Sequence, residues 1–213
     1  MGPGSAGEKD AISRDYVLVH GGMMSGVIWD EVASILRSRG HKVYCPTLAD
    51  ADTHVLEDDL EIVSKVIIDN DLHDVILAGH SFGGPVITGA YDRVPENVAT
   101  LVFFDTAYPE SGKSLRDLME SYTPGSFDGA GVPAYRPFTD PLVFDEDRFN
   151  ALPKIYANCK RSEFFESCGR QAFTKVINTS KQNNWDFFAL NSTHLCMEDR
   201  PEDTAAILLG EFH

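Results

Sequence analysis

The chain has 213 residues, 43% of them hydrophobic and 24% charged, which suits one domain with a sizeable core. Its net charge of −15 disfavours binding to nucleic acid or anionic membranes, and no apolar run approaches the roughly 20 residues of a transmembrane helix. The N-terminus lacks the apolar region of a signal peptide, and the four cysteines form no Cys-x-x-Cys pair, so we expect a cytoplasmic protein with reduced thiols and no metal or cofactor.

The pattern of apolar residues predicts alternating strands and helices. Residues 1–10 are expected to be disordered or vector-derived, and residues 11–213 to form one domain. Buried runs predict strands at 16–20, 41–45, 75–78, 98–104, 155–159 and 185–190. Helical spacing predicts helices at 29–39, 56–67, 84–91, 163–177 and 201–212. This alternation indicates an α/β protein with a mostly parallel sheet of about six strands and helices on both faces.

Residues 107–150 interrupt this alternation. They are rich in proline, glycine and aromatic residues and show only short periodic pieces. Long insertions of this kind are usually functional when they are ordered. We therefore predict a short cap or lid over the carboxyl end of the sheet.

The stretch from Asp74 to Pro85 is typical of a nucleophile elbow. An apolar strand leads into Gly79-His-Ser-Phe-Gly, and a helical pattern follows. In this context G-x-S-x-G places a strained serine, Ser81, at a sharp turn before a helix N-terminus. Gly79 and Gly83 are expected because a Cβ there would clash with the neighbouring strand or helix.

The other candidate residues also follow predicted strands. Gly22, Asp105 and His194 come at or just after strand ends, as Ser81 does, and ligands of parallel sheets bind beyond these ends. A serine nucleophile needs a base, and His194 is the only histidine after the elbow apart from His213. The N–H groups of Phe82 and Gly22 could form an oxyanion hole. We expect His20 and His80 to have structural roles.

Three segments resemble the α/β-hydrolase superfamily. They begin at Val17 (Val-Leu-Val-His-Gly-Gly), at Gly79 (Gly-His-Ser-Phe-Gly-Gly) and at Thr193 (Thr-His-Leu-Cys-Met). Within the superfamily they look like the small esterase group of plant methyl-ester esterases, hydroxynitrile lyases and bacterial relatives. The resemblance implies a single-domain α/β-hydrolase fold, with Ser81 as nucleophile, His194 as base, and Gly22 and Phe82 as oxyanion donors.

The triad acid departs from the pattern of that group, which usually places an aspartate after the next-to-last strand. Here the matching position holds Ser162, and Glu163 follows it. Some members of the superfamily carry the acid after the strand that follows the elbow, where this chain has Asp105. We favour Asp105 as the acid; Glu163, or no functional acid, are the alternatives.

The expected substrate is a small or medium carboxylic ester, thioester or lactone, cleaved through an acyl-enzyme on Ser81. Some of the following apolar residues are predicted to line its pocket: Met23, Met24, Phe82, Tyr108, Phe127, Tyr135, Phe138 and Phe144. A non-catalytic binding protein on the same fold is the first alternative. A hydroxynitrile lyase is less favoured, because such lyases resemble this chain but place Thr at the position of Gly21 and Lys at that of Leu195. A homodimer is left open.

Overall fold

The structure is a computed structural model that describes residues 13–49, 54–122, 124–125, 136–162, 178 and 185–212. Two expectations lie outside these ranges. They are the disordered or vector-derived character of residues 1–10 and the helix at 163–177. Phe127, Tyr135 and Glu163 also lie outside the described residues.

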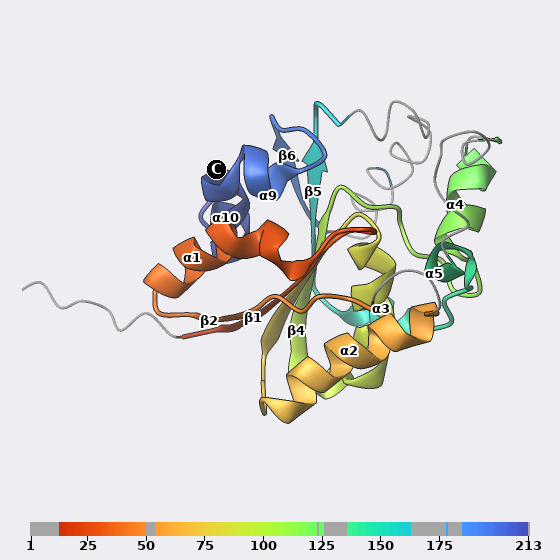
Figure 1. The fold of residues 1–213 in the computed structure, drawn as a ribbon, viewed down its shortest axis with the longest axis horizontal. Coiled ribbons are helices and arrows are strands. Elements are labelled where there is room, and N and C mark those ends of the chain that lie inside the picture. The colour runs from red at the N-terminus through yellow and green to blue at the C-terminus, as the bar shows by residue number, and fades with distance from the viewer. Residues whose placement is uncertain are drawn as a thin grey trace, which may run out of the picture.

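The described strands form one parallel sheet, as the alternating pattern predicts (Figure 1). Its order is β2-β1-β3-β4-β5-β6. The strands are β1 (Asp15–Val19), β2 (Lys42–Tyr44), β3 (Val75–His80), β4 (Val98–Phe104), β5 (Lys154–Cys159) and β6 (Asp186–Leu190). The predicted fold class is therefore confirmed, and no strand end differs from its predicted position by more than two residues.

The register of the central strands brings the loops that follow them together. His80 pairs with Phe104 across β3 and β4, so Ser81 and Asp105 leave neighbouring strands at the same level. Val19 of β1 pairs with Gly79 on the other side of β3. Because carboxyl ends of parallel strands share one edge, the loops after β1, β3 and β4 meet there.

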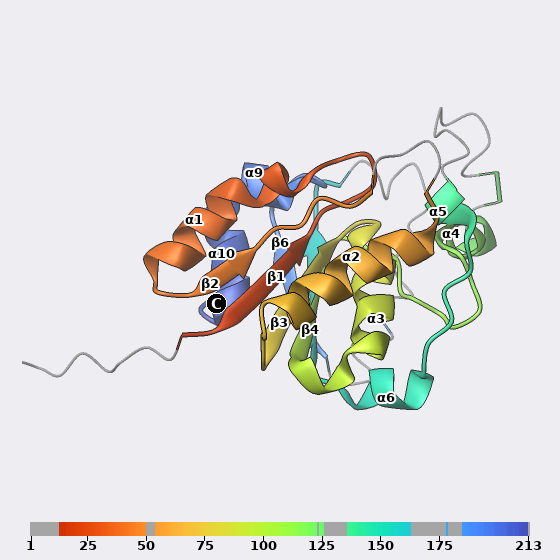
Figure 2. The same ribbon diagram turned by 60° about the horizontal axis from the view of Figure 1, so that its bottom comes forward.

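Helices cover both faces of the sheet, as Figures 1 and 2 show. On one face lie α1 (Asp30–Ser38), α9 (Cys196–Asp199) and α10 (Pro201–Leu209), together with the 3₁₀ turn η1 (Gly26–Trp29). On the other lie α2 (Leu56–Asp69) and α3 (Gly83–Arg93). A further 3₁₀ turn, η2 (Pro95–Asn97), precedes β4. Each face has its own core of buried apolar side chains, and burial of that surface stabilises the layers.

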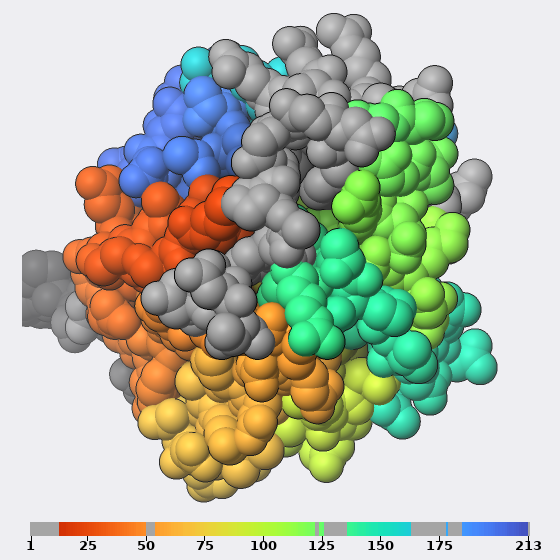
Figure 3. All heavy atoms as spheres, turned by 45° about the vertical axis from the view of Figure 1, so that its right-hand side comes forward, coloured from red at the N-terminus to blue at the C-terminus, as the bar shows by residue number. Residues whose placement is uncertain are grey.

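The described part of the 107–150 insertion holds three short helices: α4 (Leu115–Tyr122), α5 (Arg136–Thr139) and α6 (Glu146–Ala151). Figure 3 shows α5, in teal, between the start of α2 in orange and α4 in green. A hydrogen bond joins the insertion to that helix: the Leu56 N–H donates to Asp140 Oδ2 over 3.0 Å. The insertion is thus anchored near the N-terminus of α2.

Helix α4 was not expected from the apolar pattern, but its start carries a sequence signal. The Asp117 N–H donates to Ser114 Oγ over 3.0 Å, and the Ser114 N–H donates to Asp117 Oδ2 over 2.9 Å. This reciprocal pair resembles a capping box, with aspartate in place of the usual glutamate. Ser114 and Asp117, at the right spacing before an apolar run, could have indicated this helix.

No helix among the described residues is long and apolar enough to cross a membrane.

Candidate active site

The elbow around Ser81 has the predicted succession of strand, turn and helix. Strand β3 ends at His80, Ser81 has a φ of +52°, and α3 begins at Gly83. A positive φ is uncommon for a residue with a side chain, and such strain clusters at functional sites. Two hydrogen bonds hold the Ser81 backbone in this conformation: the Ser81 N–H donates to Phe104 O over 3.0 Å, and Thr106 Oγ1 donates to Ser81 O over 2.5 Å.

The two elbow glycines are required by backbone contacts, as predicted. A Cβ on Gly79 would lie less than 3.0 Å from the carbonyl of Gly83, and a Cβ on Gly83 would lie 2.8 Å from Val19 O. Neither oxygen can move without moving α3 or β1. The glycines therefore let the N-terminus of α3, with its partial positive charge, sit against the ends of β1 and β3 next to Ser81.

His194 and Asp105 form a hydrogen-bonded pair at the carboxyl edge of the sheet. His194 Nδ1 lies 2.7 Å from Asp105 Oδ2, and Asp105 is fully buried while the His194 side chain is 17% exposed. Asp105 Oδ1 accepts from the Cys159 N–H over 3.1 Å, and the Asp105 N–H donates to Ala157 O over 2.9 Å. Strand β5 thus fixes the carboxylate, and the carboxylate fixes the histidine.

The loop after β1 is shaped by the side chain of His20. His20 Nδ1 donates to Gly21 O over 2.7 Å, and Nε2 accepts from the Leu48 N–H over 2.9 Å. Both ring nitrogens are therefore occupied by backbone groups. Burial also lowers the pKa of His20, so the ring is held neutral. These contacts confirm the structural role predicted for His20.

Phe138 from the insertion covers the predicted oxyanion residues. A Cβ on Gly22 would lie less than 3.0 Å from the Phe138 ring, so the ring rests on the glycine backbone. The ring centroids of Phe82 and Phe138 are 4.8 Å apart. Phe138 therefore brings the insertion into contact with the loop that carries Gly22.

The remaining predicted pocket residues have different surroundings. Met23 has a φ of +59° and is 62% exposed. Met24 is half-buried in the same loop. Tyr108 stacks on Trp185 at 5.5 Å between ring centroids, and Phe144 packs on Phe149 at 5.1 Å, as part of one aromatic cluster. A role for these side chains in substrate contact stays a prediction.

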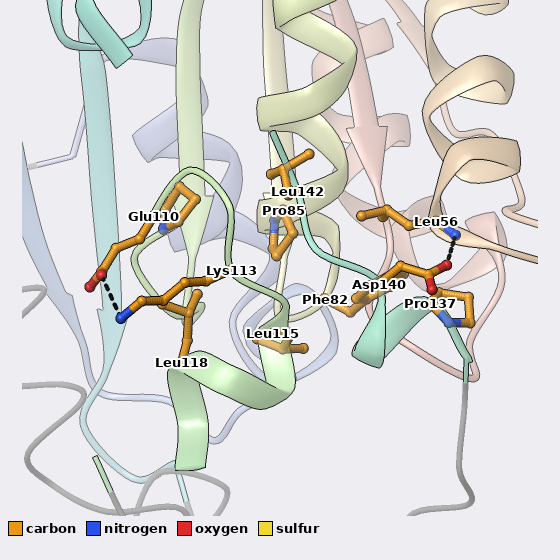
Figure 4. Close-up of a pocket in the computed structure, with 11 residues that line it drawn as sticks. Leu56, Phe82, Pro85, Glu110, Lys113, Leu115, Leu118, Pro137, Asp140 and Leu142 are labelled. Atoms are coloured by element: carbon orange, nitrogen blue, oxygen red, sulfur yellow. Dashed lines mark hydrogen bonds and ion pairs between the residues drawn. The ribbon is translucent and has the colours of Figure 1, made fainter. Parts of the chain in front are cut away.

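A small cavity lies between the insertion and the start of α3 (Figure 4). Its volume is about 10 Å³, which is room for one water molecule at most. The Phe82 ring forms part of its wall, and three charged side chains also line it: Lys113 is paired to Glu110, and Asp140 accepts from the Leu56 N–H. The other lining residues are apolar: Pro85, Pro109, Leu115, Leu118, Pro137 and Leu142.

The alternative positions for an acid differ from Asp105. Ser162 stands at the position where the resemblance leads us to expect an aspartate. It is buried, and its Oγ has no hydrogen-bond partner among the described residues. Glu163 lies outside those residues. Asp105 is thus the carboxylate that is hydrogen-bonded to His194 Nδ1 in the structure.

Within the described ranges, no cluster of three or more His, Cys, Asp or Glu side chains is arranged to hold a metal ion.

An elbow serine, a histidine–carboxylate pair and a parallel sheet with helices on both faces define the class of protein. The model of the alpha/beta hydrolase family matches residues 16–166, which is most of the chain. The chain therefore belongs to the α/β hydrolase family.

Among curated proteins, the chain is similar to esterases. It is 37% identical over 118 residues to a carbendazim hydrolyzing esterase of Nocardioides sp. (strain SG-4G), covering 52% of this chain and 49% of that protein. It is 32% identical over 118 residues to polyneuridine aldehyde esterase of Rauvolfia serpentina, covering 51% of this chain and 45% of that protein. The matches therefore span about half the length of these relatives.

Solved structures agree with the fold over nearly the whole chain. An extracellular alpha/beta-hydrolase from a Paenibacillus species superposes with a TM-score of 0.74 at 24% identity, over 94% of this chain and 99% of that chain. Polyneuridine aldehyde esterase superposes with a TM-score of 0.72 at 20% identity, over 93% of this chain and 99% of that chain. At these identities the likeness shows the fold.

Proposed function

We propose that the chain is a serine hydrolase of small or medium carboxylic esters, thioesters or lactones. The hydrogen bond between His194 Nδ1 and Asp105 Oδ2, with Asp105 following the strand next to the one that leads into the strained Ser81, carries this proposal. This is the arrangement that a weak nucleophile such as a serine hydroxyl needs at neutral pH. The similarity to proteins named as esterases supports the same class of reaction.

In the proposed reaction, Ser81 Oγ attacks the substrate carbonyl carbon while His194 Nε2 takes the hydroxyl proton. The N–H groups of Phe82 and Gly22 stabilise the oxyanion, and Asp105 stabilises the imidazolium that forms. His194 then gives the proton to the leaving alcohol, thiol or lactone oxygen, which leaves an acyl group on Ser81. Water, activated by His194, attacks this acyl-enzyme, releases the acid and restores the serine.

The hydroxynitrile-lyase alternative is disfavoured by the space around Gly21. A Cβ there would lie 2.9 Å from His80 Nδ1 and 3.1 Å from Ser81 Cβ, so the threonine typical of those lyases would crowd the elbow. Leu195 also occupies the position at which those lyases typically have lysine. A non-catalytic binding protein would not need the His194–Asp105 pair.

The test is covalent labelling with a fluorophosphonate, read by intact mass, beside hydrolysis of p-nitrophenyl acetate. We expect one label per wild-type chain, and no label together with a loss of hydrolysis of at least about 10⁴-fold in Ser81→Ala. Ser111→Ala, a serine in the insertion whose Oγ donates to Phe144 O, is the control and should label like wild type. A folded wild-type protein that neither labels nor hydrolyses esters would leave the binding-protein alternative.

Phe138 supports the proposal of a small substrate group on the carbonyl carbon. An oxyanion held by Gly22 and Phe82 would place that group beside the Phe138 ring. A bulky ring there leaves space only for short chains. Removing the ring would open space for longer chains, and the nearby cavity wall with Leu115 and Leu118 is apolar.

Phe138→Ala is therefore expected to raise the ratio of kcat/KM for p-nitrophenyl octanoate to that for the acetate by about 10- to 100-fold, because a few buried methylenes are worth that much. The ratio is measured on both purified proteins. Phe149→Ala removes the same number of atoms from the insertion at a site packed on Phe144, and should leave the ratio unchanged. An unchanged ratio in Phe138→Ala would mean that the ring does not limit chain length.

A further inference from the structure

His80, the residue before the nucleophile, contacts the three segments that meet at the site. Its side chain is fully buried. Its Nε2 lies 2.8 Å from His194 O, and the two ring centroids are 4.4 Å apart. A Cβ on Gly21 would lie 2.9 Å from its Nδ1, so the ring also presses on the loop after β1. One imidazole thus links the elbow, the loop that carries His194 (the histidine loop) and the loop after β1.

The contacts of His80 fix its tautomer. A backbone carbonyl oxygen only accepts hydrogen bonds, so His80 Nε2 carries the proton that is donated to His194 O. Burial, and then the nearby His194, hold the pKa of His80 well below its usual range, so the ring is neutral. Its Nδ1 is consequently an acceptor, and it has no hydrogen-bond partner in the part of the chain that the structure describes.

The hydrogen bond from Nε2 argues against a role in packing alone, because a phenyl ring would fill nearly the same volume without an N–H to donate. The feature that a phenyl ring lacks is the Nε2–H on His194 O. This hydrogen bond joins the backbone of the histidine loop to the residue covalently bonded to Ser81, across 114 positions of sequence.

We infer that His80 is a positioning residue of the proposed hydrolysis: its Nε2–H donates to His194 O and so fixes the imidazole of His194 relative to Ser81. The inference rests on the proposed function. Asp105 holds the His194 ring from its Nδ1 side, and His80 holds the backbone from which that ring extends. Proton transfer from Ser81 depends steeply on this geometry, because small misplacements of reacting groups slow a reaction strongly.

The test compares His80→Phe with His80→Gln, whose side-chain amide can place an N–H near the position of Nε2. We expect His80→Phe to lower kcat for p-nitrophenyl acetate and the rate of fluorophosphonate labelling by about 100-fold, with KM within about threefold. His80→Gln should recover most of the lost rate. His73→Phe, at an exposed histidine in the turn before β3, is the control and should match wild type.

The outcomes separate the inference from the proposed function. Wild-type protein that does not label contradicts the proposed function itself. Labelling of wild type and of a folded His80→Phe at equal rates would overturn the inference alone. If His80→Phe and His80→Gln both fail to fold, the imidazole ¹⁵N spectrum of wild type decides: a protonated Nε2 on a neutral ring supports the inference, and a protonated Nδ1 overturns it.

Discussion

Asp105→Asn is expected to lower kcat for ester hydrolysis by about 10⁴-fold without unfolding the protein. Asparagine has the shape of aspartate and tolerates the positive φ of +49° at this position. The Cys159 N–H would still need an acceptor, so it would keep the amide oxygen at the place of Oδ1. The amide NH₂ would then face His194 Nδ1.

This orientation explains the size of the expected effect. An amide donor facing His194 Nδ1 makes that nitrogen an acceptor, so the ring proton moves to Nε2. A protonated Nε2 on a neutral ring cannot take the proton of Ser81. The variant therefore keeps the geometry and loses the base, which is why the loss is expected in kcat and not in KM.

The measurements are ester kinetics, fluorophosphonate labelling and the ¹⁵N tautomer of His194. Asp59→Asn is the matched control, because Asp59 is also fully buried and also pairs with a histidine, His54, at 3.2 Å. It should leave kcat within a few-fold of wild type. If Asp105→Asn keeps more than about a tenth of wild-type activity, the acid lies elsewhere, and Glu163→Gln becomes the next variant to measure.

Much of this site follows from local sequence. Ser81 could be placed because a strand, a glycine-flanked turn and a helix are each signalled within a dozen residues. His194 could be placed because it is nearly the only histidine after the elbow. The strands that precede both residues occupy one parallel sheet, as the sequence predicts.

For the acid, the sequence favours Asp105 but leaves Glu163, or no functional acid, as alternatives. The choice depends on where the Asp105 carboxylate points, and this is set by the Cys159 N–H, 54 residues further along the chain. The partner of His80 could not be named from the sequence for the same reason. A structural role was expected for this residue, but the His194 carbonyl that its ring contacts is brought near only by the order of the strands.

Gly79→Ala is expected to reduce the free energy of unfolding by about 3 kcal/mol or more, because the new methyl has no space. Its Cβ would meet the backbone of Gly83 at less than 3.0 Å and Gly84 N at 3.0 Å. These atoms belong to the first turn of α3. Relieving the clash would require α3 to move away from β3, and Ser81 lies in the turn between them.

Gly89→Ala is the control, because its new Cβ would meet side chains, whereas that of Gly79→Ala would meet backbone. Its Cβ would meet Leu60 and Leu142, but only at the ends of side chains that can rotate, and alanine favours a helix over glycine by about 1 kcal/mol. We expect its stability in urea unfolding to stay within about 1 kcal/mol of wild type. Equal stability of the two variants would show that the elbow can relax. A large loss of stability confined to Gly79→Ala would show that the backbone contacts between β3 and the first turn of α3 cannot rearrange, and that they impose the strain on Ser81.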